Sequence, residues 1–334
     1  MDGRRWLLSS VALLWGCEAD TAVQPPLPTE PEGPRYDLVL DWLPGRPLPE
    51  GRERGATAVV GGVLYVAGGA QIRVEDYPIP SHNPIPFYRR DVFRLDSPVD
   101  AWARVAPLPE LPADGLRLAG NGRRLYAALG RRIWAYDPGT DVWSELTALP
   151  AVRSASTLMA IQDRLYVVGG AGPTLIFDLG REQWQEGAPV PEERTSPVLV
   201  EAGGRILALG GEVYNALESR FLPARDIVAY DPAIDAWMTV QTVPADLTVT
   251  VFRHGGLGPS GTAVHLLSED ARTQAILDLD TGVWTRVQPL RLTRTSTAVA
   301  VWDGRVLSIG GWIDRGANVP SPSLATVEWA VLPR

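Results

Sequence analysis

The sequence predicts an all-β fold, a six-bladed β-propeller in which every blade is a four-stranded antiparallel sheet. One spacing pattern recurs through almost the whole chain, which is the signature of a repeat architecture. The composition, with 33 Gly, 30 Pro and 12 Trp, favours short strands joined by tight turns over long helices. A hydrophobic content of 45% in 334 residues is enough to bury one large core.

The first marker of the repeat is a tryptophan followed six residues later by an aliphatic residue, in most copies with a proline next. An Asp preceded by a large apolar residue stands six residues before five of these tryptophans, as in Tyr136-Asp137. The tryptophans are Trp42, Trp102, Trp143, Trp184, Trp237 and Trp284. Chance does not produce such a spacing, so each copy marks one structural repeat.

The second marker is an apolar strand that ends in two glycines. Four copies keep both glycines: Leu64–Gly69, Leu165–Gly170, Ile206–Gly211 and Val306–Gly311. The copy at Leu125–Gly130 keeps one glycine, and the copy at Val264–Glu269 keeps none. Another short apolar stretch precedes each copy, so one repeat holds four short strands, which is one propeller blade.

Together these markers resemble the kelch repeat, over about residues 36–334. The resemblance implies that the glycines allow close approach between blades, that the aromatic residues pack between sheets, and that the Asp bonds turn amides. The chain begins with a fourth-strand marker at Trp42 and ends with a third-strand marker at Trp329. We therefore expect the N-terminal strand to complete the last blade, which leaves no open sheet edge.

The first 35 residues are predicted to be a targeting signal and a tether. Two arginines precede an apolar run from Trp6 to Trp15, typical of a signal peptide at residues 1–16. The run ends Leu-Trp-Gly-Cys at Cys17, the single cysteine, which resembles the bacterial lipobox with a Trp where a small residue is usual. The resemblance implies lipidation of Cys17, with residues 17–35 as a Pro-rich tether. A chance cysteine near the end of an ordinary signal peptide is the alternative.

The targeting signal implies a cellular location. We expect an exported protein of the bacterial cell envelope, anchored by its lipid, and Glu18 after the cysteine favours the outer membrane. The membrane is expected to be contacted only through the N-terminal lipid, and the protein to be a monomer. The net charge of −8 argues against a nucleic-acid partner, which requires a basic surface.

Candidate ligand-binding residues gather at one rim of the predicted propeller. An arginine stands seventeen residues before the second glycine in four blades: Arg52, Arg153, Arg194 and Arg294. Ala113 and Phe252 take this place in the two copies with degenerate glycine pairs. Long loops follow the glycine pairs at about residues 70–90, 212–225 and 312–324, and they carry Tyr77, His82, Glu212, Tyr214 and Trp312.

These residues favour an Arg-lined pocket for an anionic sugar, a carboxylate or an acidic peptide. The alternative is structural, with each arginine bonding backbone carbonyls of the neighbouring blade and the loops merely solvated. We thus expect a non-catalytic module that binds a protein or glycan through the Arg-lined face. No catalytic residue, metal ligand set or cofactor is predicted, because the three histidines are far apart and no nucleophile or phosphate-binding motif occurs.

An enzyme is the second hypothesis. The predicted blade number, the export signal and the Arg-rich rim resemble the periplasmic kelch-type sialic-acid epimerases, a class of sugar epimerase or mutarotase. That chemistry needs an acid or base beside the arginines. Glu212, directly after a glycine pair, is the best placed candidate.

Overall fold

The structure, a computed structural model, describes residues 36–72, 86–112, 115–245, 247, 251–268, 272–290, 294–313 and 322–333. The chain divides into two units, Met1–Arg35 and Tyr36–Arg334, and the described residues all belong to the second. All regular elements in the described ranges are β-strands, and these ranges contain no helix capable of crossing a bilayer. The predicted signal peptide, Cys17, the tether, Tyr77 and His82 lie outside the described residues.

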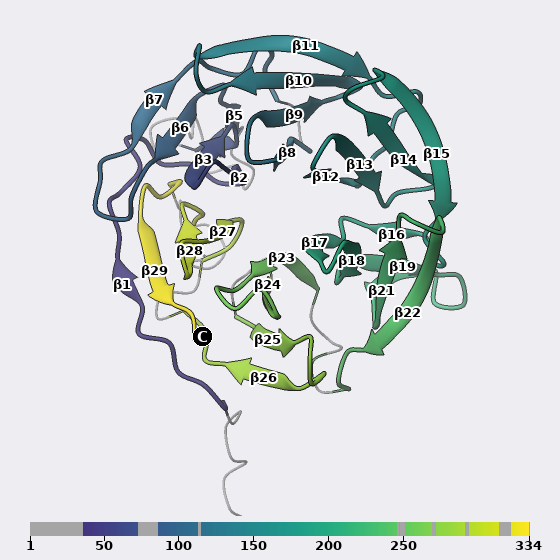
Figure 1. The fold of residues 1–334 in the computed structure, drawn as a ribbon. Helices are drawn as coiled ribbons and strands as arrows, with labels where there is room; N and C mark the ends of the chain where they lie inside the picture. The colour runs from purple at the N-terminus through teal and green to yellow at the C-terminus, as the bar shows by residue number, and fades with distance from the viewer. Residues whose placement is uncertain are drawn as a thin grey trace, which may run out of the picture. The chain divides into compact units, whose positions relative to one another are not determined.

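Six sheets in the described ranges have four strands, all antiparallel, and we number them blades one to six in chain order (Figure 1). Blade one holds β2 (Ala56–Val60), β3 (Val63–Ala67), β6 (Val92–Leu95) and β7 (Ala103–Val105). Blade two holds β8 (Arg117–Gly120), β9 (Leu125–Leu129), β10 (Arg132–Asp137) and β11 (Val142–Ala148). Blade three holds β12 (Thr157–Ile161), β13 (Arg164–Val168), β14 (Pro173–Asp178) and β15 (Gln183–Pro189).

The remaining blades repeat this order. Blade four holds β17 (Val198–Ala202), β18 (Arg205–Leu209), β21 (Asp226–Asp231) and β22 (Ala236–Thr242). Blade five holds β23 (Phe252–Leu257), β24 (Ala263–Ser268), β25 (Gln274–Asp278) and β26 (Trp284–Val287). Blade six holds β27 (Ala298–Trp302), β28 (Arg305–Ile309), β29 (Val327–Val331) and β1 (Leu43–Pro44).

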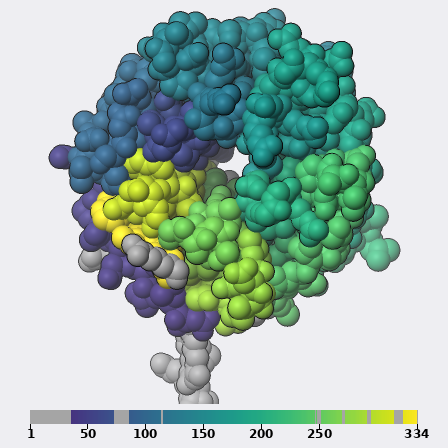
Figure 2. All heavy atoms as spheres, in the orientation of Figure 1, coloured from purple at the N-terminus to yellow at the C-terminus, as the bar shows by residue number. Residues whose placement is uncertain are grey.

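The sheets stand around a central opening, so the arrangement is propeller-like, as the sequence predicts (Figures 1 and 2). The first strands line this opening and contact one another in the order β2, β8, β12, β17, β23 and β27, and β27 also contacts β2. Strand β1 comes from the N-terminal end of the described chain and pairs with β29, Leu43 opposite Trp329. The outermost strand of blade six is thus supplied from the other end of the chain.

The repeated aromatic residues pack as cross-strand pairs inside the blades. Tyr136 faces Trp143 with ring centroids 5.1 Å apart, and Tyr230 faces Trp237 at 5.2 Å. The recurring spacing of six residues from Asp to Trp spans the turn between the third and fourth strands, since Asp178 ends β14 and Trp184 is the second residue of β15. In that turn the carboxylate of Asp178 accepts the amides of Gly180 and Arg181, at 3.0 and 2.9 Å. The role predicted for the Asp is confirmed. The predicted packing of aromatic residues between sheets is seen where Tyr65 of blade one meets Tyr136 of blade two, with ring centroids 5.9 Å apart.

The glycine pair joins neighbouring blades, as predicted. The amide of Gly211 in blade four donates to the carbonyl of Phe252 in blade five at 3.0 Å, and the amide of Gly311 in blade six donates to that of Arg52 in blade one at 2.8 Å. Gly211 has a φ of +71°, and a Cβ there would lie 2.3 Å from the carbonyl oxygen of Thr195. The position therefore requires glycine, because the backbones approach too closely for any side chain.

Two small sheets extend the connections between second and third strands. In blade one, β4 (Ala70–Gln71) pairs with β5 (Phe87–Tyr88). In blade four, β19 (Glu212–Asn215) pairs with β16 (Arg194–Thr195) and β20 (Arg220–Pro223). Antiparallel order places these connections at the rim where every first strand begins, and we call it the loop rim.

Candidate functional site

The four predicted arginines lie at the loop rim, and all four are buried. Their guanidinium groups donate to backbone carbonyls of their own blade. Arg194 donates to Ala208 at 3.1 Å and to Asp226 at 2.8 Å, and Arg153 donates to Pro173 at 2.9 Å and to Ala171. Each arginine therefore ties the start of the first strand to the connection between the second and third strands. The structural interpretation had placed these carbonyls in the neighbouring blade, but they belong to the same one, because the first strand starts beside its own loop.

Arg294 in blade six is the most completely bound of the four. It donates to the carbonyls of Gly310 and Thr326 at 2.9 and 3.0 Å and to Glu328 at 2.8 Å. Burial lowers the pKa of Arg294, and the Glu328 carboxylate opposes that shift. A guanidinium held in this way stabilises its blade.

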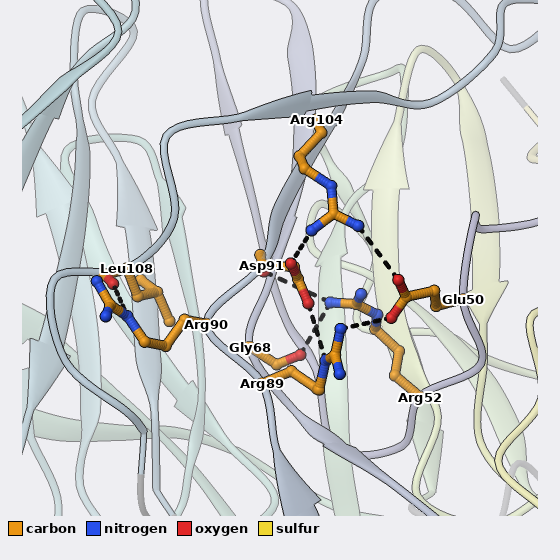
Figure 3. A network of polar contacts seen from close by, with 8 residues as sticks. All are labelled: Glu50, Arg52, Gly68, Arg89, Arg90, Asp91, Arg104 and Leu108. Carbon is orange, nitrogen blue, oxygen red and sulfur yellow. Dashed lines mark hydrogen bonds and ion pairs between the residues drawn. The ribbon is translucent and has the colours of Figure 1, made fainter. Parts of the chain in front are cut away.

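Arg52 lies within a network of charged side chains on blade one (Figure 3). Its Nη1 donates to the carbonyl of Gly68 at 3.0 Å, and its guanidinium lies 4.5 Å from the centre of the Phe93 ring. Burial lowers its pKa to about 10, against the raising influence first of Asp91 and then of Glu50.

Two further arginines close this network. Arg89 bridges Glu50 at 2.6 Å and Asp91 at 2.9 Å, and Arg104 contacts the same two carboxylates (Figure 3). Glu50 belongs to the segment between β1 and β2, so the network ties that segment to blade one. Its carboxylates are already paired with arginines of this chain.

The central channel contains a cavity of about 640 Å³, which the first strands of the blades line. Most of its wall is apolar or hydroxyl-bearing. The charged or titratable side chains in the wall are Arg117, Glu201, Arg253 and His254. The two arginines and the histidine come from blades two and five, the blades in which the glycine pair is degenerate, and these blades lie three positions apart around the opening (Figure 1).

Glu212 and Arg253 form an ion pair at the loop-rim end of this channel. The Arg253 Nη2 lies 2.6 Å from the Glu212 Oε2, and both side chains are about a quarter exposed. Glu212 opens β19 on blade four and Arg253 is the second residue of β23 on blade five, so the pair spans two blades. Sequence analysis selected Glu212 but did not identify its partner.

His254 follows Arg253 in the channel wall. Burial lowers its pKa to about 4, and the positive charge of Arg253 adds to the effect. The imidazole is therefore neutral at pH 7 and can accept or donate a hydrogen bond.

Arg117 lines the channel on blade two. Its Nε donates to the carbonyl of Ser156 at 2.8 Å, and its Nη2 donates to that of Arg153, both in the neighbouring blade three. Two of its donor atoms are therefore bonded to the backbone of blade three. Burial lowers its pKa.

The other predicted residues lie on the loops. Tyr214 is exposed on β19, and Trp312 is half-buried on blade six, where its main chain pairs with Thr295 at 3.0 and 2.9 Å. Tyr77 and His82 lie outside the described residues. Of the predicted set, the structure brings Glu212 and Tyr214 together on one hairpin and keeps the four arginines apart in separate blades.

The described residues contain no candidate metal centre. No group of three or more His, Cys, Asp or Glu side chains meets in those ranges. The polar groups at the channel are guanidinium, imidazole and carboxylate groups. These groups suit hydrogen bonding to a polar ligand.

Comparisons with known proteins support the fold. No family model matches the chain, and no match appears among the curated proteins. The chain is similar to a solved structure called YjhT, with a TM-score of 0.62 and 14% sequence identity, over 83% of this chain and 94% of that one. An identity this low indicates a shared fold, the propeller-like arrangement of antiparallel sheets.

Proposed function

We propose that the chain is a kelch-type propeller of six blades, closed by β1 in blade six, and that it is a lipid-anchored binding protein of the bacterial envelope. Its loop rim would bind a protein or glycan ligand without catalysing a reaction. The closure is supported by the pairing of β1 with β29 and by the contact of β27 with β2. The anchor rests on the sequence around Cys17.

The binding role rests on one observation: the extra sheets and the polar side chains of the channel lie at the same rim. The extra sheets β4–β5 and β16–β19–β20 both extend from the loop rim, and Arg117, Arg253 and His254 line the channel beside them. The four arginines are buried and donate to backbone carbonyls, so we assign the ligand contacts to the side chains at the mouth of the channel instead. Loops on a rigid β-scaffold are the usual place for recognition.

Site-specific photo-crosslinking tests which rim binds. A benzoylphenylalanine at Tyr214 reports on the loop rim of blade four, and one at Ile234, which is 65% exposed in the turn between β21 and β22, reports on the opposite rim of the same blade. We expect adducts in intact envelopes from position 214 only. Equal adducts from both positions would contradict a binding role for the loop rim.

The anchor has a separate test. The wild-type chain should incorporate radiolabelled palmitate in a bacterial host and partition with membranes, and Cys17→Ser should do neither. A Cys17→Ser chain that remains in the membrane fraction would exclude the lipid as the anchor.

The Glu212–Arg253 pair favours one second candidate, a sugar epimerase of the kind that acts on sialic acid. A carboxylate held 2.6 Å from a guanidinium beside a neutral imidazole could exchange a proton with a sugar hydroxyl. NMR of sialic-acid anomers tests this, because the wild type should accelerate their equilibration and Glu212→Gln should not. An unchanged rate with wild-type protein would remove the candidate.

A further inference from the structure

The β19–β20 hairpin presents two aromatic rings to solvent. Tyr214 is 55% exposed and Phe221 is 51% exposed, and their rings meet edge to face with centroids 5.4 Å apart. Leu217, in the turn between the strands, is 97% exposed. Exposed apolar side chains that cluster in this way commonly mark an interaction site.

The hairpin is pre-organised. Strand β16 pairs with the other side of β19. In the turn, the Asn215 Oδ1 accepts the amides of Leu217 and Glu218 at 2.9 and 3.2 Å. The rings are therefore held in place before a ligand arrives, which lowers the entropic cost of binding.

The register of the hairpin places a charged pair on the same face as the rings. Tyr214 lies opposite Phe221, and Glu212 lies opposite Pro223. Because side chains alternate along a strand, Glu212 and Tyr214 share one face, about 7 Å apart along β19. Glu212 is bound to Arg253, so an aromatic pair and a carboxylate–guanidinium pair adjoin one another.

This combination matches the surface of a sugar ring. A pyranose has an apolar face of axial C–H groups, which stacks on aromatic rings, and a rim of hydroxyl groups. One hydroxyl can donate to a carboxylate and accept from a guanidinium at once, which suits the Glu212–Arg253 pair.

The size and borders of the patch favour a sugar over a protein. A stable protein interface takes about 800 Å² from each partner. Here the exposed apolar side chains of the hairpin are the two rings and Leu217, and the Glu212–Arg253 pair adjoins the rings. An apolar area of this extent suits one or two sugar rings.

We propose that this hairpin face is a glycan subsite for a hydroxylated pyranose. The C–H face of the sugar stacks on Tyr214 and Phe221, and its hydroxyl groups bond Glu212 and Arg253. The subsite rests on the proposed binding role of the loop rim and names the class of its ligand.

Saturation-transfer NMR on the purified full chain tests the subsite, with maltotriose, cellotriose, chitotriose and trigalacturonate as probes. We expect at least one to bind, with the strongest transfer to its axial C–H protons. The double variant Tyr214→Ala/Phe221→Ala should weaken binding roughly tenfold or more, and Tyr214→Phe should keep it. Phe87→Ala is the matched control, because Phe87 is 50% exposed on the loop rim of blade one and should not affect binding.

The outcomes separate the subsite from the proposed function. No transfer to any of the four probes, or equal binding by the double Ala variant, overturns the subsite. Photo-adducts from position 214 with a protein partner would then leave the binding role of the rim standing. A loss with Phe87→Ala as large as with the double variant would also overturn the assignment to blade four.

Discussion

The blades with a complete glycine pair and those with a degenerate one use arginine in opposite ways. In blade four, Arg194 is buried and bonds two carbonyls of its own sheet. In blade five, Phe252 takes that position and still accepts the amide of Gly211 through its backbone carbonyl. The arginine of blade five, Arg253, is the next residue and turns to the channel, where it pairs with Glu212.

The difference shows which contacts between blades do not need the buried arginine. The junction between blades depends on backbone groups, which survive the loss of the buried arginine. In the two blades with a degenerate glycine pair, polar side chains face the opening instead: Arg117 in blade two, and Arg253 with His254 in blade five.

The largest expected effect is the loss of a buried arginine from a complete blade. Arg294→Met leaves Glu328 and the carbonyls of Gly310 and Thr326 without their donor. We expect the free energy of unfolding to fall by about 3–5 kcal/mol, measured by urea denaturation. Arg253→Met is the control from a degenerate blade and should cost less than about 1 kcal/mol, because its ion pair is partly exposed. Equal costs would abolish the distinction between the two kinds of arginine.

The glycines sharpen the same contrast. Gly211→Ala would place a Cβ 2.3 Å from the Thr195 carbonyl oxygen, whereas Gly130→Ala in blade two meets no atom within 4 Å. Both residues have positive φ, +71° and +58°, so both variants pay about 1–2 kcal/mol of backbone strain. We expect Gly211→Ala to cost about 2–4 kcal/mol because the clash is added to this strain. Thermal unfolding of the two variants compares them, and a cost for Gly130→Ala as large as that for Gly211→Ala would be the contrary result.

The pH dependence of blade five should differ from that of its counterparts. His265 is buried where blades four and six have Leu207 and Leu307, and burial lowers its pKa to about 3, with Gln274 opposing the shift. The unfolded chain, whose histidine pKa is about 6.5, binds more protons between these values. As the pH is lowered from about 6.5 to about 3, the free energy of unfolding should therefore decrease, by up to about 1.4 kcal/mol per pH unit from this residue.

His265→Leu tests this. The variant should lose that part of the slope between pH 6.5 and pH 3, in urea titrations matched to wild type. Parallel curves for the two proteins would mean that His265 is not held neutral.

The smallest effect concerns the indole N–H groups between blades. Trp237 donates to Thr174 and Ala188 in blade three at 3.1 and 3.0 Å. The indole N–H of Trp284, in blade five, is buried without a hydrogen-bond partner among the described residues. Trp237→Phe should cost about 1 kcal/mol more than Trp284→Phe, measured by denaturant unfolding. Equal costs would show that the two indole N–H groups are equally well bonded.

The sequence predicts the interior of each blade well. The spacing of Tyr136 and Trp143, or of Gly210 and Gly211, reports contacts within a blade or between consecutive blades, because every copy meets the same local geometry. Its weakness lies in the arginines of the loop rim. Arg194 and Arg253 are the same residue type at nearly equivalent positions. Arg194 is buried inside its blade and Arg253 lines the channel, and the sequence does not distinguish these two orientations.

The order of residues alone determined the all-β class, the repeat and the structural roles of the glycine, aromatic and Asp markers, since these depend on local backbone conformation and residue size. The tertiary structure decided what faces the channel. Glu212 and Arg253 lie 41 positions apart, in different blades. Such a contact depends on how successive twisted sheets accumulate rotation around the opening, which no local pattern encodes.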